Sequence, residues 1–465
     1  MNKKLVLLTA TILLMLVAVF IVLFIKTKPE ISSLPKNNNP VVSPVTNGDK
    51  IKLVYAAHWT EKYQLEGVYE NGVLKEKGFK QYLDEYMTLH PNVDISVLTV
   101  PYADYEAKIK LLNDIDQAPD IFQIYSPWGV SYAKEGLLDV PPKDIKADVE
   151  ANYVSKSGVV IDGNVWGIPG EVNDYSLIYN KKMFKDAGIV DADGNALAPK
   201  TWDDVVAAAK KITKKDTKGN IIKYGFAFTK GVDWAVVDPF LSLLFSNGGS
   251  YLSADNSKPM FNDAKGVEVL TSIVDLFKKG YTDANSNVWD FSNDKAAMAF
   301  VAPWTEGTFR DQMGTRFDQE VGVTSVPYFS KPNSLQYSWF VGVMNKSKNK
   351  KAAWDFLRWF TEDVQPSGTT RYGDLLARTI KAIPDRKVDL VSSANKDVLV
   401  SNTFKAPFIA QLSSSTPEPN VLQAAKIKAT LMEQIQAAWV GKDVKQALDD
   451  AASRVQLILD SNNKK

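Results

Sequence analysis

Residues 93–125, VDISVLTVPYADYEAKIKLLNDIDQAPDIFQIY, contain the pattern that decides the fold class. Apolar side chains alternate along residues 93–99, as they do in a half-buried strand. Residues 105–112 carry them at helical spacing, and residues 120–125 form a short apolar run that predicts a second strand. Strand, helix and strand in such short order indicate a parallel sheet with right-handed crossover connections.

The same alternation continues on both sides of this stretch. Residues 51–57 form an apolar run typical of a buried strand, and residues 74–90 carry apolar side chains at helical spacing. Further along, residues 177–179 predict a strand, 202–212 a helix and 224–228 another strand. We therefore expect an α/β protein of two units, each a mostly parallel sheet flanked by helices. Ligands of such sheets bind at the carboxyl ends of the strands.

The N-terminus predicts a membrane segment. Residues 5–25 are uncharged and follow Lys3 and Lys4, and a helix of this length spans about 31 Å, enough to cross a bilayer. No small-x-small cleavage site follows, so we expect residues 1–28 to be an uncleaved anchor, with a long signal peptide as the alternative. The basic residues before the apolar run place the rest of the chain outside the cytoplasm.

Residues 29–50 predict a tether between this anchor and the folded part. Pro29, Pro35, Pro40 and Pro44 stand among serine and asparagine residues. Prolines at this density prevent regular structure and keep a segment extended. The tether would hold a folded module near the membrane and let it reorient.

The composition favours a binder over a catalyst. The chain has 11 Trp, 18 Tyr and 21 Phe, but only 2 His and no Cys. The lack of cysteine excludes disulfides, thiolate zinc sites, iron–sulfur clusters and cysteine nucleophiles. A formal net charge of +1 argues against nucleic acid as the main partner.

The motifs of the common enzyme classes do not occur in the sequence. It contains no nucleophile elbow, zinc-protease motif, phosphate loop or dinucleotide fingerprint. The run Asp191–Asn195 is similar to a calcium loop, but its glycine is misplaced and a solvated turn explains it better. We expect no catalytic residue and no cofactor, and a bound metal ion is left open.

Several short blocks follow one another along the chain. They are APDIF (118–122), DGNVWGIP (162–169), LIYNK (177–181), PKTWD (199–203), KAAM (295–298) before Pro303–Trp304, and AAWDFL (352–357). In order and spacing, over roughly residues 51–460, they resemble the family 1 extracellular solute-binding proteins of ABC importers. Within that family, the maltose-binding-like sugar binders are the most similar in character.

The resemblance implies a periplasmic-binding-protein-like fold, in which two lobes close over a ligand. The three crossings between the lobes would fall near residues 168–172, 322–327 and 361–366. The first lobe would comprise residues 51–168 and 327–361, and the second residues 172–322 and 366–460. The implied protein is a monomer on the outer side of the cell membrane that captures a mono- or oligosaccharide and delivers it to an ABC permease.

Sugar binding needs flat aromatic faces and planar hydrogen-bonding groups. The resemblance implies a stacking role for Trp304, and a cleft carboxylate at Glu171 or Asp174, either of which could instead cap or brace the hinge. Each aromatic candidate has ordinary core packing as its alternative. The candidate ligand-binding residues are Trp304, Glu306, Glu171, Asp174, Trp59, Glu61, Tyr125, Trp128, Trp234 and Trp339.

Two segments depart from the family pattern. In maltodextrin binders, aromatic residues follow the Pro-Asn turn before a C-terminal helix, but here Pro419–Asn420 is followed by Val, Leu, Gln and Ala. This difference argues against a long maltodextrin as the ligand. Residues 64–77 do not align cleanly with the family either.

Two other functions remain as alternatives. A surface glycoside hydrolase needs two carboxylates, and such a pair leaves no fixed spacing in a sequence. A ligand sensor that works independently of transport would share the binding features. The sequence identifies neither the ligand, which could be a sugar, a polyol or a peptide, nor the partner permease.

Overall fold

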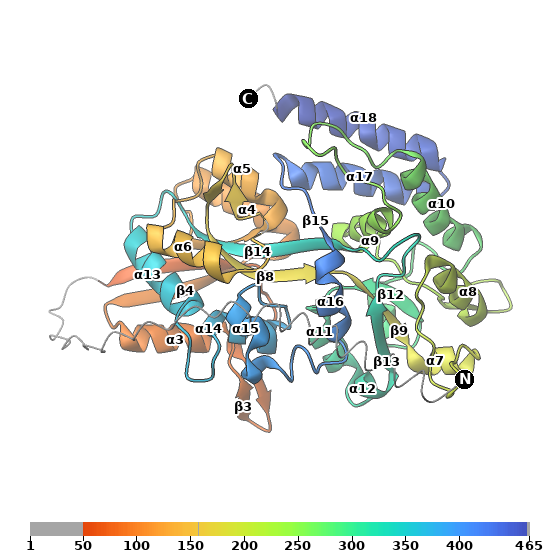
Figure 1. Ribbon diagram of the computed structural model, residues 1–465, viewed down its shortest axis with the longest axis horizontal. Coiled ribbons are helices and arrows are strands. Elements are labelled where there is room, and N and C mark those ends of the chain that lie inside the picture. Colours follow the sequence, from red (N-terminus) through yellow and green to blue (C-terminus); the bar gives the residue numbers. More distant parts are fainter. Residues whose placement is uncertain (1–49, 157, 463–465) are drawn as a thin grey trace, which may run out of the picture. The chain divides into compact units, whose positions relative to one another are not determined.

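The computed structural model describes residues 50–156 and 158–462 (Figure 1). Its larger sheet, here called the first sheet, has six strands in the order β15-β14-β5-β1-β4, with β8 paired to β14. The strands are β1 (Ile51–Ala57), β4 (Val93–Thr99), β5 (Ile121–Tyr125), β8 (Ile168–Asp174), β14 (Leu335–Val343) and β15 (Thr416–Pro417). The parallel pairing of β1 with β4 and β5 confirms the crossover pattern of the opening stretch. β14 runs antiparallel to β5 and β8, so the sheet is mixed.

A smaller sheet, here called the second sheet, has β9 (Ser176–Asn180) between β12 (Met298–Val301) and β13 (Val321–Ser325). Both neighbours run antiparallel to β9, so the prediction of a mostly parallel sheet in each unit is wrong for this one. β12 and β13 run in the same direction and are joined by α11 (Thr305–Met313) and α12 (Arg316–Glu320). The strand between them points the other way because it continues β8 out of the first sheet through a single residue, Tyr175.

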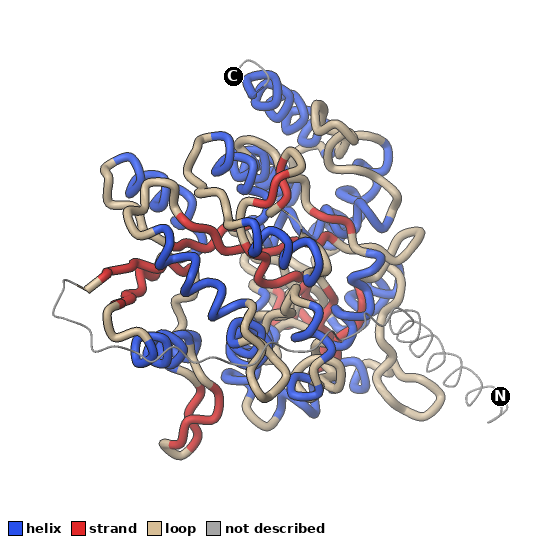
Figure 2. The backbone as a smooth tube through the Cα atoms, turned by 60° about the vertical axis from the view of Figure 1, so that its left-hand side comes forward, coloured by secondary structure: helices blue, strands red, loops and turns tan. Residues whose placement is uncertain are grey.

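Two further sequence predictions need correction. The predicted helix 74–90 is shorter, α3 (Phe79–Leu89), and is preceded by a hairpin of β2 (Val68–Glu70) and β3 (Val73–Glu76). The predicted strand 224–228 makes only isolated bridges, from Tyr224 and Ala227 to β12 and its approach. The hairpin projects from the rest of the described chain in both views (Figure 1, Figure 2).

Local sequence signals account well for several helices. α8 (Trp202–Ile212) begins where expected, because Thr201 accepts a hydrogen bond from the Asp204 amide and Asp204 accepts one from the Thr201 amide. Its apolar side chains, among them Trp202, are buried.

Helices surround both sheets (Figure 1). The longer ones are α4 (Tyr102–Asp114), α6 (Lys143–Asn152), α9 (Asp233–Ser246), α10 (Ala264–Lys278), α11 (Thr305–Met313), α13 (Lys350–Thr361), α17 (Ala424–Trp439) and α18 (Val444–Asn462). The shorter ones are α2 (Lys62–Glu66), α5 (Gly129–Lys134), α7 (Lys181–Asp186), α12 (Arg316–Glu320), α14 (Arg371–Asp374), α15 (Lys387–Val391) and α16 (Ala406–Gln411). Single-turn segments are η1 (Ser126–Trp128), η2 (Val288–Phe291), the π-helix η3 (Leu375–Ile380), η4 (Ser393–Asn395) and η5 (Leu412–Ser414). Minor strand pairs are β6 (Val160–Ile161) with β7 (Asn164–Val165), and β10 (Lys214–Lys215) with β11 (Ile221–Lys223).

The lobe boundaries and the anchor stay predictions. The predicted anchor, residues 1–28, and the predicted tether up to residue 49 lie outside the described residues. Within residues 50–156 and 158–462, no helix is both long enough and apolar enough to cross a bilayer.

Candidate functional site

Three predicted candidates lie side by side across the first sheet. Trp339 of β14 is paired with Tyr125 of β5 on one side and with Glu171 of β8 on the other. Directly paired residues of neighbouring strands present their side chains to the same face. Register therefore joins three residues that are far apart in the sequence.

An aromatic cluster surrounds Trp339. The His58 ring stacks on its indole with ring centroids 3.7 Å apart, and the rings of Tyr125 and Trp128 lie at 5.4 and 5.8 Å. Tyr102 of α4 stacks on Trp128 at 5.8 Å. Burial lowers the pKa of His58 to about 3, so its imidazole is neutral at physiological pH. The cluster is thus a set of flat, uncharged rings.

Trp304 and Trp234 approach this cluster from the side of the second sheet. Trp304 precedes α11 and is half-buried, and its indole N–H donates a 3.0 Å hydrogen bond to the Tyr337 hydroxyl on β14. Trp234 of α9 packs edge-on against Trp304, with centroids 5.2 Å apart. The structure therefore brings together aromatic candidates from both sheets.

Glu171 supplies a buried carboxyl group beside the aromatic rings. Its pKa is raised to about 8 because burial disfavours the charged form, against a smaller opposing effect of Asn173. Its Oε2 atom has no hydrogen-bond partner among the described residues. A carboxyl group that is largely protonated at neutral pH can both donate to and accept from a ligand hydroxyl.

Trp59 and Gln123 add polar atoms next to His58 of the aromatic cluster. The Trp59 indole nitrogen and the Gln123 Nε2 atom are buried and have no partner within the described part of the chain. Gln123 Oε1 accepts the His58 amide at 2.9 Å, and Trp59 lies 6.4 Å from the Tyr372 ring. These unpaired donors are the kind of group that a polar ligand satisfies.

A buried ion cluster borders the aromatic rings. The Lys428 ammonium of α17 lies 2.7 Å from Asp238 and 3.2 Å from Glu418. The Tyr125 hydroxyl donates to Glu418 at 2.6 Å, and the Tyr102 hydroxyl donates to Asp233 at 3.0 Å.

Burial raises the pKa of Asp238 to about 7, although Lys428 opposes the shift. Burial lowers the pKa of Lys428, but the surrounding carboxylates outweigh it and hold that pKa well above its ordinary value.

The other three candidates have structural partners outside the aromatic cluster. Asp174 is fully buried at the end of β8 and accepts a 2.9 Å hydrogen bond from Ser415, which fits the hinge-bracing alternative.

Glu306 accepts hydrogen bonds from Arg310 and Asn402, each at 2.8 Å, and lies 3.8 Å from Lys405. Burial raises the pKa of Glu306, but Lys405, Asn402 and Arg310 outweigh it and hold that pKa below its ordinary value. Glu61 is exposed and caps α2. Their roles in binding stay predictions.

Sequence reasoning missed several residues of the site. Asp233 directly precedes the predicted Trp234, and Tyr337 lies two positions before the predicted Trp339, so closeness in the sequence to a predicted tryptophan is a usable signal. Lys428 had no such signal, because it lies in a long helix, 303 positions from Tyr125. Only the folded chain brings it to the cluster.

No predicted candidate lines the cavity that lies between the end of α9 and β15. This cavity of about 300 Å³ is lined mainly by residues 248–252 after α9, by Lys331 and Asn333, and by Thr416 and Pro417. Within the described ranges, no group of three or more His, Asp and Glu side chains is placed to hold a metal ion.

Comparison with known proteins identifies the family. Residues 71–365 match the family described as bacterial extracellular solute-binding protein. The chain is 24% identical to a maltotriose-binding protein of Pyrococcus abyssi over 302 residues, which cover 62% of this chain and 60% of that protein. It is 23% identical to a maltooligosaccharide ABC transporter solute-binding lipoprotein of Streptococcus pneumoniae over 416 residues, 84% of this chain and 88% of the relative.

Solved structures share the fold. An ABC transporter solute-binding protein of Thermotoga lettingae with bound α-D-tagatose superposes with a TM-score of 0.71, at 21% identity, over 89% of this chain and all of that one (100%). The GacH receptor of Streptomyces glaucescens gives a TM-score of 0.72 at 20% identity, over 88% of this chain and 99% of that one. Both show the expected mixed α/β, two-domain periplasmic-binding-protein-like fold. Together with the family match, they place this chain in the bacterial extracellular solute-binding protein family.

Proposed function

We propose that this chain is the solute-binding component of an ABC importer and that its solute is a carbohydrate. The choice of ligand rests on one observation: Trp339 and Tyr125 lie directly beside the buried carboxyl group of Glu171, whose Oε2 atom has no hydrogen-bond partner among the described residues. Flat aromatic faces stack on sugar rings, and a carboxyl group pairs with their hydroxyls. Relatives named for maltotriose and maltooligosaccharide binding support the same class of ligand.

In this proposal, the two sides of the site close over the sugar, and no covalent bond is made or broken. Aromatic groups from the two sheets enclose the sugar, and two hydrogen bonds join the opposing sides, Tyr102 to Asp233 and Trp304 to Tyr337. Exclusion of water strengthens the polar contacts inside. The loaded protein then delivers its sugar to the permease. The relatives described above are binding proteins, which favours a binder over an enzyme.

The proposed location is the outer side of the cell membrane, with the N-terminal segment as anchor and a single copy of the chain as the working unit. Support comes from the apolar run at residues 5–25 and from the extracellular family. Membrane fractionation with N-terminal sequencing tests the anchor. A mature chain that begins after residue 26 would contradict it.

Calorimetric titration of the full-length protein tests the proposed function. The probes are glucose, maltose, cellobiose, maltotriose and maltoheptaose, with chromatography of each mixture after incubation. Binding of at least one sugar, recovered unchanged, is the expected result. Release of a shorter product would favour the hydrolase instead, and absence of heat with every sugar would contradict carbohydrate binding.

A further inference from the structure

We infer that residues 61–78 form an end wall of the binding site, which restricts the ligand to a short saccharide. The segment consists of α2 and the β2–β3 hairpin, and the family match begins within it, at residue 71. The inference rests on the proposed function, because it names which carbohydrates the site admits. Three observations support it: the close backbone contact at the base of the hairpin, the anchoring of the segment by Arg378, and the contact of Tyr63 with α11.

The segment is closed at its base by two glycines. A Cβ atom on Gly78 would lie 2.2 Å from the Gly67 nitrogen and 2.6 Å from the Leu65 carbonyl carbon, so the two ends of the hairpin meet without room for a side chain. Gly67 also has a φ of 88°, a conformation that other residues rarely adopt. The backbone on the two sides of the hairpin is therefore in direct contact, at Gly78 on one side and Leu65–Gly67 on the other.

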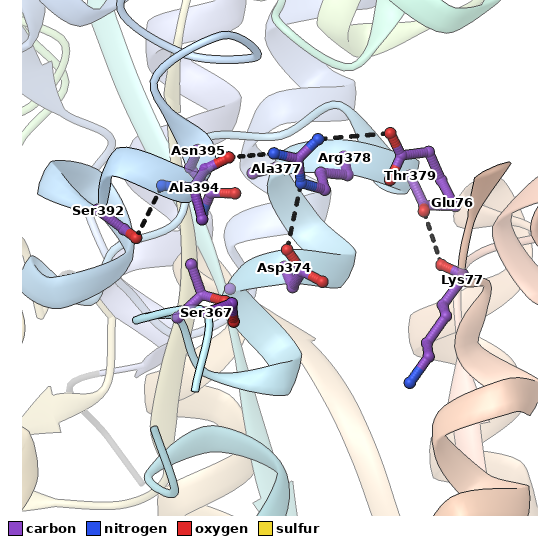
Figure 3. A network of polar contacts seen from close by, with 12 residues as sticks. Glu76, Lys77, Ser367, Asp374, Ala377, Arg378, Thr379, Ser392, Ala394 and Asn395 are labelled. Carbon is purple, nitrogen blue, oxygen red and sulfur yellow. Dashed lines mark hydrogen bonds and ion pairs between the residues drawn. The ribbon is translucent and has the colours of Figure 1, made fainter. Parts of the chain in front are cut away.

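Arg378 anchors the segment to the π-helix η3 (Figure 3). Its guanidinium lies 3.4 Å from Glu76 on β3, 3.3 Å from Asp374 and 3.1 Å from Asp397, and it also donates to the Ala394 carbonyl. The neighbouring Thr379 hydroxyl donates a 2.7 Å hydrogen bond to the Lys77 carbonyl. A network of several charge-assisted contacts holds a segment more firmly than one exposed ion pair does.

The segment touches α11 next to Trp304. A Cβ atom on Gly307 would lie 3.0 Å from the Tyr63 hydroxyl, so the Tyr63 ring packs directly on the bare backbone of that helix. Gly307 follows Trp304 by three positions, and residues at that spacing share one face of a helix. Tyr63 is half-buried there, and burial, with smaller effects of Glu61 and Asp311, raises its pKa to about 12. Tyr63 thus packs on α11 one helical turn after Trp304.

In this inference, residues 420–423, directly before α17, limit the binding site on a second side. Asn420 accepts the Val130 amide of α5 at 2.8 Å and donates to the Gly158 carbonyl at 3.3 Å, and the Gln423 amide donates to Ser131 at 3.2 Å. These bonds hold residues 420–423 against α5, in a stretch that has no aromatic residue. In this inference, the two contacts leave room for a mono- or disaccharide between them, and a long glucan chain would have to displace one of them.

Titration of full-length wild type, Tyr63→Ala and Tyr63→Phe with short and long members of one series tests the inference. The probes are maltose with maltoheptaose, and glucose or cellobiose with cellopentaose. Wild type should bind the long sugar at least about tenfold more weakly than the short one, equivalent to ~1.4 kcal/mol. Tyr63→Ala should remove most of that difference, and Tyr63→Phe, which keeps the ring, should preserve it. Tyr69→Ala, at the exposed hairpin, is the matched control and should behave as wild type.

The possible failures are distinguishable. If wild type binds a long sugar as tightly as the short one, or if Tyr63→Ala leaves the ratio unchanged, the end wall is wrong and the sugar-binding function stands. If no sugar of either length binds, the proposed function itself fails. Melting curves of each variant confirm that the compared proteins are folded.

Discussion

Trp304 is the residue whose proposed role is easiest to separate from core packing. It is half-buried between Tyr337 and Trp234, whereas Trp202 is a core tryptophan with 2% of its surface exposed. If the Trp304 ring stacks on a sugar, Trp304→Ala should weaken binding about 30-fold or more, because buried aromatic anchors contribute about 2 kcal/mol or more. Calorimetric titration beside a melting curve measures both effects.

The control for this prediction is Trp202→Ala. That change should lower the melting temperature, since loss of a core tryptophan costs about 3–5 kcal/mol of folding stability. Trp304→Phe should keep much of the affinity because it keeps a flat ring. A Trp304→Ala variant that melts far below wild type, or that binds sugar normally, would return Trp304 to the core.

Glu171 gives the protein a pH-dependent stability. Its folded-state pKa is raised from 4.5 to about 8, so between these values the folded chain binds more protons than the unfolded chain. The free energy of unfolding should therefore fall as pH rises through this window, with a slope of up to about 1.4 kcal/mol per pH unit from this group. Glu171→Gln cannot ionise and should lack this contribution.

Urea denaturation of wild type and Glu171→Gln across this pH window measures the effect. The difference in stability between the two proteins isolates Glu171 from other titrating groups, such as Asp238 and Lys405. A difference that stays constant from acid to alkaline pH would show that Glu171 does not titrate as described.

At the scale of single residues, local patterns predicted some site positions and missed others for a physical reason. Tyr125 and Glu171 were predictable because strand ends and the family pattern mark them in the sequence. Asp238 and Lys428 are joined by an ion pair between α9 and α17, and no local pattern records a contact between distant helices. Glu306 has the residue type of a ligand-binding group, but its neighbours Arg310, Asn402 and Lys405 already engage its carboxylate.

At the scale of elements, periodicity predicted β1, β4 and β5 of the first sheet and helices such as α8, but it did not predict β8, β14 or β15, nor the antiparallel direction of β9. β9 is antiparallel to β12 and β13 because it continues directly from β8, whose position and direction are set by the first sheet. Local periodicity carries no information about such a long-range constraint. Leu74, Lys75 and Glu76 are good helix formers, yet the turn at Asn71–Gly72, both with positive φ, pairs them with β2 instead.

The local stability of the β2–β3 hairpin should depend on Arg378. Arg378→Ala removes the contacts to Glu76, Asp374 and Asp397, each a charge-assisted bond. Such bonds contribute about 1.5–3 kcal/mol, so amide hydrogen exchange in residues 68–77 should become about 10- to 100-fold faster. Exchange in β14, far from the hairpin, should not change.

Arg454→Ala is the matched control for this variant. Arg454 makes a bidentate ion pair with Glu433 on the exposed faces of α17 and α18. Its removal should leave the hairpin as protected as in wild type. Equal protection of residues 68–77 in wild type and Arg378→Ala would mean that the network in Figure 3 does not hold the segment.

At the scale of the whole molecule, the proposed function requires the two sheets and their helices to move as units about the short links between them. Tyr175 alone separates β8 from β9, and residues 326–334 separate β13 from β14. Two hydrogen bonds, Tyr102 to Asp233 and Trp304 to Tyr337, join the opposing sides of the site. Saturating sugar should therefore reduce the radius of gyration by hinge motion, without any change in secondary structure.

Tyr102→Phe tests whether these bonds stabilise the closed arrangement. The variant keeps the ring that stacks on Trp128 but cannot donate to Asp233, so closure loses one hydrogen bond to a carboxylate. Affinity should fall about tenfold, as expected for a bond of about 1.5 kcal/mol, and small-angle scattering should show a larger decrease in radius on sugar binding than in wild type. Identical scattering of wild type with and without saturating sugar would contradict hinge closure. An unchanged affinity in Tyr102→Phe would contradict only the role of this bond, because the sugar can close the site through its own contacts with Trp304 and Trp339.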